Sequence, residues 1–142
     1  MDQFNALSTA QLAAIDSADM SSLTTDQLQA LSTAKVAGLT TANLAALTSA
    51  QLGKLTTDVI AALSTDQVKS IPTDDLAGVT ADQIAALTTA QIASLGSAQV
   101  ANLSTAQLVA IETRDIGSIT SANIAALTVR RLANCRWISS MR

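Results

Sequence analysis

Residues 87–95 read LTTAQIASL and residues 39–47 read LTTANLAAL, and each stretch carries the signals that begin a short helix. A Thr follows the leading Leu, a Gln or Asn stands three residues after that Thr, and an apolar residue comes next. In a capping box the Thr hydroxyl accepts a hydrogen bond from the backbone N–H three residues on, and the amide side chain reaches back to the N–H of the Thr. The pattern therefore predicts a new helix in every unit of eight residues.

This eight-residue unit, the octad, recurs along almost the whole chain without insertion or deletion, so internal repetition decides the architecture. A first apolar column holds Leu, Ile or Val at every eighth position from Leu7 to Leu127, and a second column runs five residues behind it. We expect the two columns to form the core, with these representatives: Leu7, Leu12, Leu39, Leu44, Leu63, Val68, Leu87, Ile92, Leu103, Leu108, Leu127 and Leu132.

One continuous helix cannot bury both columns. At 100° per residue an octad advances about 800°, so the apolar stripe would drift by about 80° per repeat and circle the rod. The chain must therefore turn every eight residues. Pro72 and Gly96 both stand at the cap position, which agrees with a turn there, because either residue would destabilise the interior of a helix. The predicted helix caps include Ser8, Thr24, Thr40, Thr56, Thr88, Ser104 and Thr120.

These features predict an all-α solenoid of very short helices, one per eight-residue repeat. A β-solenoid is the alternative, because short regular repeats also build that fold. The two columns are separated by five and then three residues, both odd spacings that would place them on opposite faces of a strand, and Ala and Gln are poor strand formers. One octad buries only two large aliphatic side chains, so stability must come from contacts between neighbouring repeats.

Composition narrows the function classes. Only 13% of the 142 residues are charged and about half are apolar, which is too apolar for a disordered chain. Ser, Thr, Asp or Gln interrupts every apolar run, so we expect no transmembrane segment. The chain has no His and a single Cys135, which removes the commonest general base and zinc ligand. We therefore expect neither an enzyme nor a bound cofactor.

Four carboxylates share one octad position in successive repeats and are weak candidates for a Ca²⁺ site: Asp58, Asp66, Asp74 and Asp82. Stacked turns would bring some of them together, and Ca²⁺ prefers clustered oxygen ligands. The helix dipole also favours an acidic residue in the first turn, which explains these positions without a metal.

Paired hydroxyls recur at the start of the octads and could form a regular array of the kind found in ice-binding proteins: Thr40/Thr41, Thr56/Thr57 and Thr88/Thr89. The competing explanation is local, since the first Thr of each pair caps a helix and the second lies in its first turn.

The end of the chain differs from the repeats. Residues 1–128 hold eleven acidic and four basic residues, whereas residues 129–142 hold four Arg and no acid. The register also fails there, because Cys135 and Ser140 occupy the apolar columns. We expect a repeat solenoid over residues 1–132 and an out-of-register basic tail over residues 133–142, either a cap or foreign sequence. The acidic body opposes binding of nucleic acid.

The units LTTAQIASL, LTTANLAAL and VTADQIAAL resemble the octapeptide repeats of long bacterial proteins that are predicted to be secreted or surface-attached. Some of those proteins carry haem-utilisation or adhesin-like labels. The resemblance covers residues 4–132 and implies an extracellular or cell-surface location as part of a longer protein, although this chain carries no signal peptide. A haem role would need axial ligands, and the chain offers only Met1, Met20, Met141 and Cys135.

We therefore expect a structural repeat protein that acts as a rigid spacer or as a self-assembling filament or adhesin segment at a bacterial cell surface. Its expected partner is itself, through lateral or end-to-end contacts. The alternative is a solenoid module that binds a peptide or a glycan, because many repeat proteins bind ligands along one face. Ice binding or Ca²⁺ binding is the third possibility.

Overall fold

The computed structural model describes residues 6–111, 115 and 117–127, and there the predicted all-α solenoid of one short helix per octad is confirmed. The β-solenoid alternative is wrong, since these residues contain no strand. None of their helices is both long and apolar enough to cross a membrane. The elements are α2 (Thr9–Ala13), α3 (Ser17–Ser22), α4 (Thr25–Gln29), α5 (Thr33–Val36), α6 (Thr41–Ala45), α7 (Ser49–Leu52), α8 (Thr57–Ala61), α9 (Thr65–Ser70), η1 (Asp75–Gly78), α10 (Ala81–Ala85), α11 (Thr89–Ser94), α12 (Ser97–Asn102), α13 (Thr105–Ala110) and α15 (Ser121–Ala126).

The corner between consecutive helices consists of two extended residues. Leu103 has φ −59° and ψ 135°, and the following cap residue Ser104 has φ −67° and ψ 163°, both close to polyproline II. No residue in the described ranges has a positive φ. The turn therefore needs no glycine, and Gly96 adopts the same extended conformation as the Thr and Ser caps, with φ −75° and ψ 157°.

Pro72 changes the helix that follows it. Proline offers neither a hydroxyl to cap the helix nor an N–H for the capping box. The octad that begins at Ile71 accordingly forms the 3₁₀ helix η1, and the Asp75 N–H donates to the Pro72 carbonyl at 3.1 Å.

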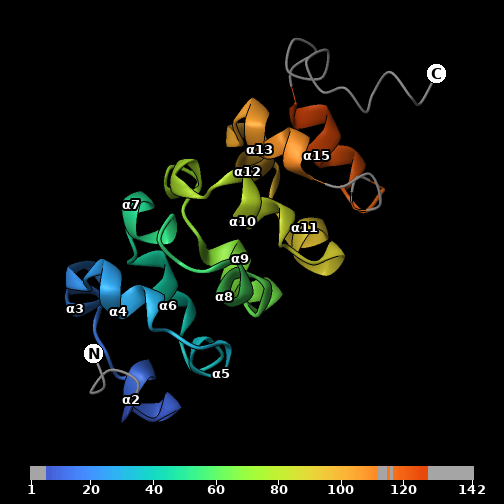
Figure 1. Ribbon diagram of the computed structural model, residues 1–142. Helices are drawn as coiled ribbons and strands as arrows, with labels where there is room; N and C mark the ends of the chain where they lie inside the picture. Colours follow the sequence, from blue (N-terminus) through green and yellow to red (C-terminus); the bar gives the residue numbers. More distant parts are fainter. Residues whose placement is uncertain (1–5, 112–114, 116, 128–142) are drawn as a thin grey trace.

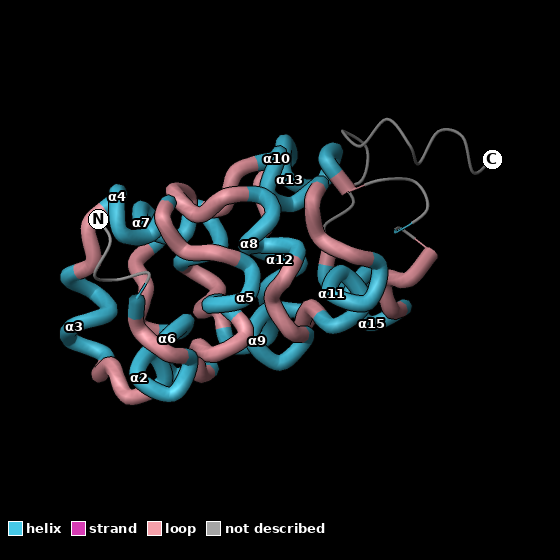
Figure 2. Tube along the Cα trace, turned by 60° about the horizontal axis from the view of Figure 1, so that its bottom comes forward, coloured by secondary structure: helices cyan, strands magenta, loops and turns pink. Residues whose placement is uncertain are grey.

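Three octads complete one coil of the solenoid. Helices that stand 24 residues apart in the chain pack on each other, as α6 does on α9, α9 on α11, α10 on α13 and α12 on α15. Successive helices lie in turn on the three sides of a rod, and the rod runs from the N-terminal to the C-terminal end of the described chain (Figures 1 and 2). Each corner therefore turns the chain by about a third of a circle.

Both apolar columns lie inside this rod and form one cluster. The exceptions are the first-column residues of the first described coil, Leu7, Ile15 and Leu23, together with Ile124 of the second column, all of which are only partly buried. Among the expected core residues, Leu7 is thus partly exposed, and Leu132 lies outside the described residues. The others are buried: Leu12, Leu39, Leu44, Leu63, Val68, Leu87, Ile92, Leu103, Leu108 and Leu127.

Adjacent coils approach closely at the last octad position, which holds Ala, Ser or Gly in every described octad except those that end in Lys54 and Asn102. A Cβ added to Gly38 would lie 2.6 Å from the Thr9 Cβ in the preceding coil. A Cβ added to Gly78 would collide with the Ser49 carbonyl in the same relation. The Ala, Ser and Gly residues at this position are therefore explained by packing between coils.

Candidate functional site

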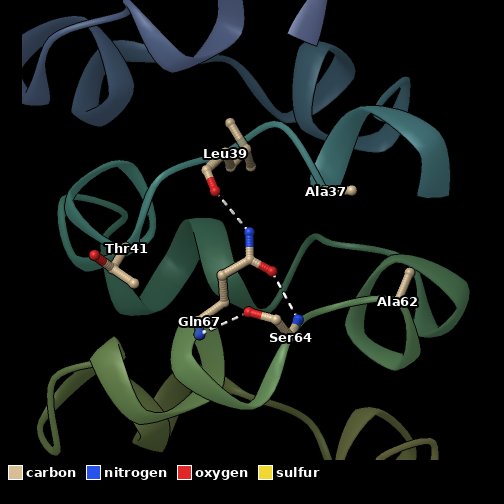
Figure 3. Close-up of a pocket in the computed structure, with 6 residues that line it drawn as sticks. All are labelled: Ala37, Leu39, Thr41, Ala62, Ser64 and Gln67. Atoms are coloured by element: carbon tan, nitrogen blue, oxygen red, sulfur yellow. Dashed lines mark hydrogen bonds between the residues drawn. The ribbon is translucent and has the colours of Figure 1, made fainter. Parts of the chain in front are cut away.

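The polar side chains of each octad form a local network at the helix start. In the octad of α9, the Ser64 hydroxyl accepts a hydrogen bond from the Gln67 N–H at 3.1 Å, and the Gln67 Oε1 accepts one from the Ser64 N–H at 2.7 Å (Figure 3). This reciprocal pair is the capping box expected from the octad. All seven predicted caps stand at the N-terminus of a helix and accept such a bond: Ser8, Thr24, Thr40, Thr56, Thr88, Ser104 and Thr120.

The other half of the same glutamine side chain reaches into the preceding coil. The Gln67 Nε2 donates to the Leu39 carbonyl at 2.7 Å and to the Val36 carbonyl at 2.9 Å. Figure 3 shows this side chain spanning from its own helix to the strand-like corner of the coil before it. The Leu39 carbonyl belongs to a residue 28 positions earlier, which is one 24-residue coil plus the four positions that separate Gln from the first column.

This 28-residue bond recurs along the rod, and we call the set of donors the inter-coil ladder. Its members are Lys35, Asn43, Gln51, Gln67, Gln83, Gln91, Gln99, Gln107 and Asn123.

The ladder supplies a donor to a carbonyl that the helix cannot use. Each helix accepts its first backbone hydrogen bond at the cap residue, so the first-column carbonyl just before the cap has no helical partner. That carbonyl is also buried, since Leu39 and Leu55 are each only 5% exposed. A buried carbonyl without a donor costs about 1–3 kcal/mol, so each ladder bond removes a substantial penalty.

The length of the ladder side chain sets how many bonds it makes. Six glutamines of the ladder also reach the carbonyl 31 residues earlier, as Gln83 does to Leu52 at 2.9 Å. Asn43 and Asn123 are one methylene shorter and reach only the nearer carbonyl, at 2.6 Å in both cases. Lys35 replaces the amide with its ammonium group, which donates to the Leu7 carbonyl.

Three octads place a side chain in the ladder position that does not donate across the interface. Val59 is buried and apolar. Asp75 belongs to the 3₁₀ helix that follows Pro72. Asp115 is buried, and its Oδ1 accepts a hydrogen bond from the Thr89 hydroxyl of the preceding coil at 2.5 Å.

The four candidate Ca²⁺ ligands are not assembled into one site. Asp58 and Asp82 lie on the stacked helices α8 and α10, whereas Asp66 lies on α9 and Asp74 precedes η1 on the third side. All four are exposed, and no three acidic, thiol or imidazole groups gather within the ranges that the structure describes. The three-octad coil explains this, because it sends successive repeats to different sides.

The two hydroxyls of each pair have different surroundings. The first Thr of each pair caps its helix, as described above. Among the second, Thr41 and Thr89 are exposed on one side of the rod, on α6 and α11, and Thr65 of α9 stands between them. Thr57 lies on another side, on α8. An aligned hydroxyl row thus exists along one side, and ice binding by it stays a prediction.

Shallow depressions interrupt the outer surface of the described part of the chain, and two of them lie near the ladder. One, of about 280 Å³, is lined by Ala37, Leu39, Thr41, Ala62, Ser64 and Gln67 (Figure 3). The other, of about 420 Å³, is lined by Ser49, Ala50, Gly53, Lys54, Gly78 and Thr80. Apart from Leu39 and Lys54, the lining residues are small or belong to the capping boxes and the ladder.

The ALTTAQ repeat matches residues 1–33, 25–57, 36–71 and 68–105, overlapping stretches that together span residues 1–105 of the 142. The chain belongs to the ALTTAQ repeat family. No curated protein and no solved structure matches it.

The six letters of the ALTTAQ repeat can be followed directly in residues 86–91 of this chain. Ala86 holds the small last position of the preceding octad, and Leu87 is a buried first-column residue. Thr88 is the helix cap, and the next two residues are exposed in the first turn. Gln91 closes the capping box and donates to the Leu63 carbonyl at 2.6 Å. The six residues of the repeat name therefore supply one helix cap, one core residue and one donor of the inter-coil ladder.

Sequence reasoning found the caps and the apolar columns but missed the ladder. The signal was the column of Gln or Asn that recurs in most octads. Each of these side chains has an NH2 group that the capping box does not use. The predicted basic tail at residues 133–142, Cys135, Met1 and Met141 lie outside the described residues. Met20, the remaining haem-ligand candidate, is fully buried in the second apolar column.

Proposed function

We propose that this ALTTAQ repeat chain is a structural spacer, a stiff rod segment that sets a distance at a bacterial cell surface and joins end to end with further copies. The observation that carries the proposal is the inter-coil ladder. It connects successive coils by the same bond on up to three sides, so length can grow by adding coils without any change of fold.

The direction of the ladder supports end-to-end joining. Every ladder bond runs from a donor in one coil to a carbonyl in the coil before it, so the two ends of any stretch of coils differ and complement each other. In the first described coil, Gln11 and Gln27 bond their own caps at 2.8 and 2.9 Å and donate across no interface in the described ranges. A second copy could supply carbonyls to these amides in the geometry that the chain already uses internally.

The outer surface supports a spacer rather than an enzyme. The exposed positions are mostly Ala, Ser, Thr and Asp, and Val109, at 51%, is the exposed large apolar residue of the described part of the chain. The side-chain amides of the buried Gln and Asn residues already form hydrogen bonds in the capping boxes and the inter-coil ladder. We therefore assign the chain no catalytic role.

Electron microscopy of the purified 142-residue chain over a concentration series, with circular dichroism on the same sample, tests this proposal. We expect helical rods that lengthen as concentration rises. The double variant Leu7→Lys/Leu23→Lys should keep the helical spectrum and lose elongation, because both residues are partly exposed in the first described coil. The matched control Val109→Lys, on an outer side, should elongate like the parent. Discrete short particles at every concentration would exclude end-to-end joining, and elongation of the double variant would exclude this interface.

The cell-surface location is tested separately. Protease treatment of intact cells that produce the full-length parent protein should remove the repeat segment. A repeat segment that becomes sensitive only after lysis would contradict the proposed location.

A further inference from the structure

One interface between coils is much less bonded than its neighbours. Residues 31–54 and 55–78 form successive coils, and we call the interface between them the seam. Of the three ladder positions that face it, only Gln67 donates across it. The other two positions hold Val59 and Asp75, and apart from the bond between the Leu55 N–H and the Leu52 carbonyl, where the chain passes from one coil to the next, no other hydrogen bond joins these two fully described coils.

The neighbouring interfaces show the contrast. Residues 31–54 bond the preceding coil through all three ladder positions: Lys35, Asn43 and Gln51. Residues 79–102 likewise bond the coil before them through all three: Gln83, Gln91 and Gln99. The next interface keeps Gln107 and Asn123, and there Asp115 still connects the coils by accepting from Thr89.

The missing bonds leave buried carbonyls at the seam. By the 28-residue rule, Val59 faces the Leu31 carbonyl and Asp75 faces the Leu47 carbonyl. Leu31 is 4% exposed and Leu47 is 1% exposed, and neither carbonyl receives a hydrogen bond in the described structure. Buried carbonyls without donors weaken the closed state of this interface relative to a separated one, in which water can reach them.

The seam also has open space at the surface. Both depressions described above lie along it, because each is lined by residues from the coils on either side. Beside the second depression, the backbones at Gly53 and Gly78 approach so closely that an added Cβ would collide with a carbonyl. The coils are therefore held at the seam by the packing of α7 on η1 and of α6 on α9, and it is the missing hydrogen bonds that distinguish this interface.

We infer that the seam is a built-in break point that divides the rod into two cooperative blocks, residues 6–54 and 55–127. The rod bends or opens at the seam before it does so at any other described interface. Nearest-neighbour coupling sets the cooperativity of repeat arrays, so the weakest interface separates independently unfolding blocks. This inference does not depend on the proposed spacer function.

Hydrogen exchange measured by mass spectrometry under native conditions tests the inference with a matched pair. Gln67→Val removes the last ladder donor of the seam, and Gln91→Val removes the equivalent residue on the same side at a fully bonded interface. Gln67→Val should make residues 6–54 exchange faster than residues 55–111 by a ratio on the order of tenfold above that of the parent chain. Gln91→Val, which leaves two donors at its interface, should not change that ratio.

The converse variant is Val59→Gln, which restores a donor at the seam and should reduce any difference in exchange between the two blocks. Equal responses to Gln67→Val and Gln91→Val would overturn the inference, whether or not Val59→Gln folds. A block boundary that appears at another interface, such as the one between residues 78 and 79, would overturn it as well.

Discussion

The ladder makes a graded prediction at Gln83, where one side chain carries three separable hydrogen bonds. Its Oε1 accepts from the Thr80 N–H at 2.7 Å, and its Nε2 donates to the Leu55 carbonyl at 2.6 Å and to the Leu52 carbonyl at 2.9 Å. The side chain is 2% exposed. Gln83→Leu would remove all three bonds, whereas Gln83→Asn should keep the first two, as Asn43 does at its own interface.

The two losses differ in magnitude because the carbonyls differ. The Leu52 carbonyl also accepts from the Leu55 N–H at 3.2 Å, so Gln83→Asn leaves no orphaned group and should cost about 1 kcal/mol. The Leu55 carbonyl has no second donor in the described structure, so Gln83→Leu adds a desolvation penalty to the lost bonds. After allowance for the apolar gain of Leu, we expect a loss of about 3 kcal/mol.

Urea unfolding followed by far-ultraviolet circular dichroism gives the free energies of unfolding for the parent and both variants. The expected order of stability is parent, then Gln83→Asn, then Gln83→Leu, with a gap of about 2 kcal/mol between the variants. If both variants lose the same stability, neither the capping-box bond nor the bond to the Leu55 carbonyl contributes, and the assignment of a stabilising inter-coil bond at Leu55 is wrong.

Three further predictions follow from the same contacts. Gln83→Glu keeps the cap acceptor but points a carboxylate at two carbonyls, and burial and those carbonyls should raise the pKa of the new carboxyl. The loss in free energy of unfolding should therefore be smallest at acidic pH and grow as pH rises through that pKa. Urea titrations at several pH values would detect this dependence. Gly78→Ala should lower the free energy of unfolding by about 1–3 kcal/mol because the added Cβ meets the Ser49 carbonyl, while Gly117→Ala, with nothing within 4 Å, should be close to neutral. The thermal midpoint should be the same in Ca²⁺ and in chelator, because the aspartates are spread over three sides; a rise in Ca²⁺ would show that carboxylates do gather.

Local features of the fold could be read from the octad because the interactions behind them are local. A capping box spans three residues, so LTTAQ predicts a helix start wherever it occurs, and the structure places helices after Thr40 and Thr88 accordingly. In one continuous helix the apolar stripe would drift by about 80° per octad, and this geometry alone excludes a single long helix. Even the departures were visible as residue types, since Pro72 and Val59 break the octad pattern in the sequence.

The number of octads per coil was decided only by the tertiary structure. It depends on the extended dihedral angles of the two corner residues and on how closely the stacked backbones approach, and neither quantity is encoded in the apolar period. That number determines which residues meet, and therefore whether four aspartates gather or disperse.

The sequence by itself determined where most helices begin, which two apolar columns form the core and that the chain must turn every eight residues. Only the tertiary structure decided that a glutamine such as Gln67 bonds a carbonyl 28 residues away, and that Val59 and Asp75 face one and the same interface. The physical reason is that a side chain can satisfy its own helix end through neighbours in sequence, but a second polar group on that side chain is satisfied by whichever coil the fold stacks against it.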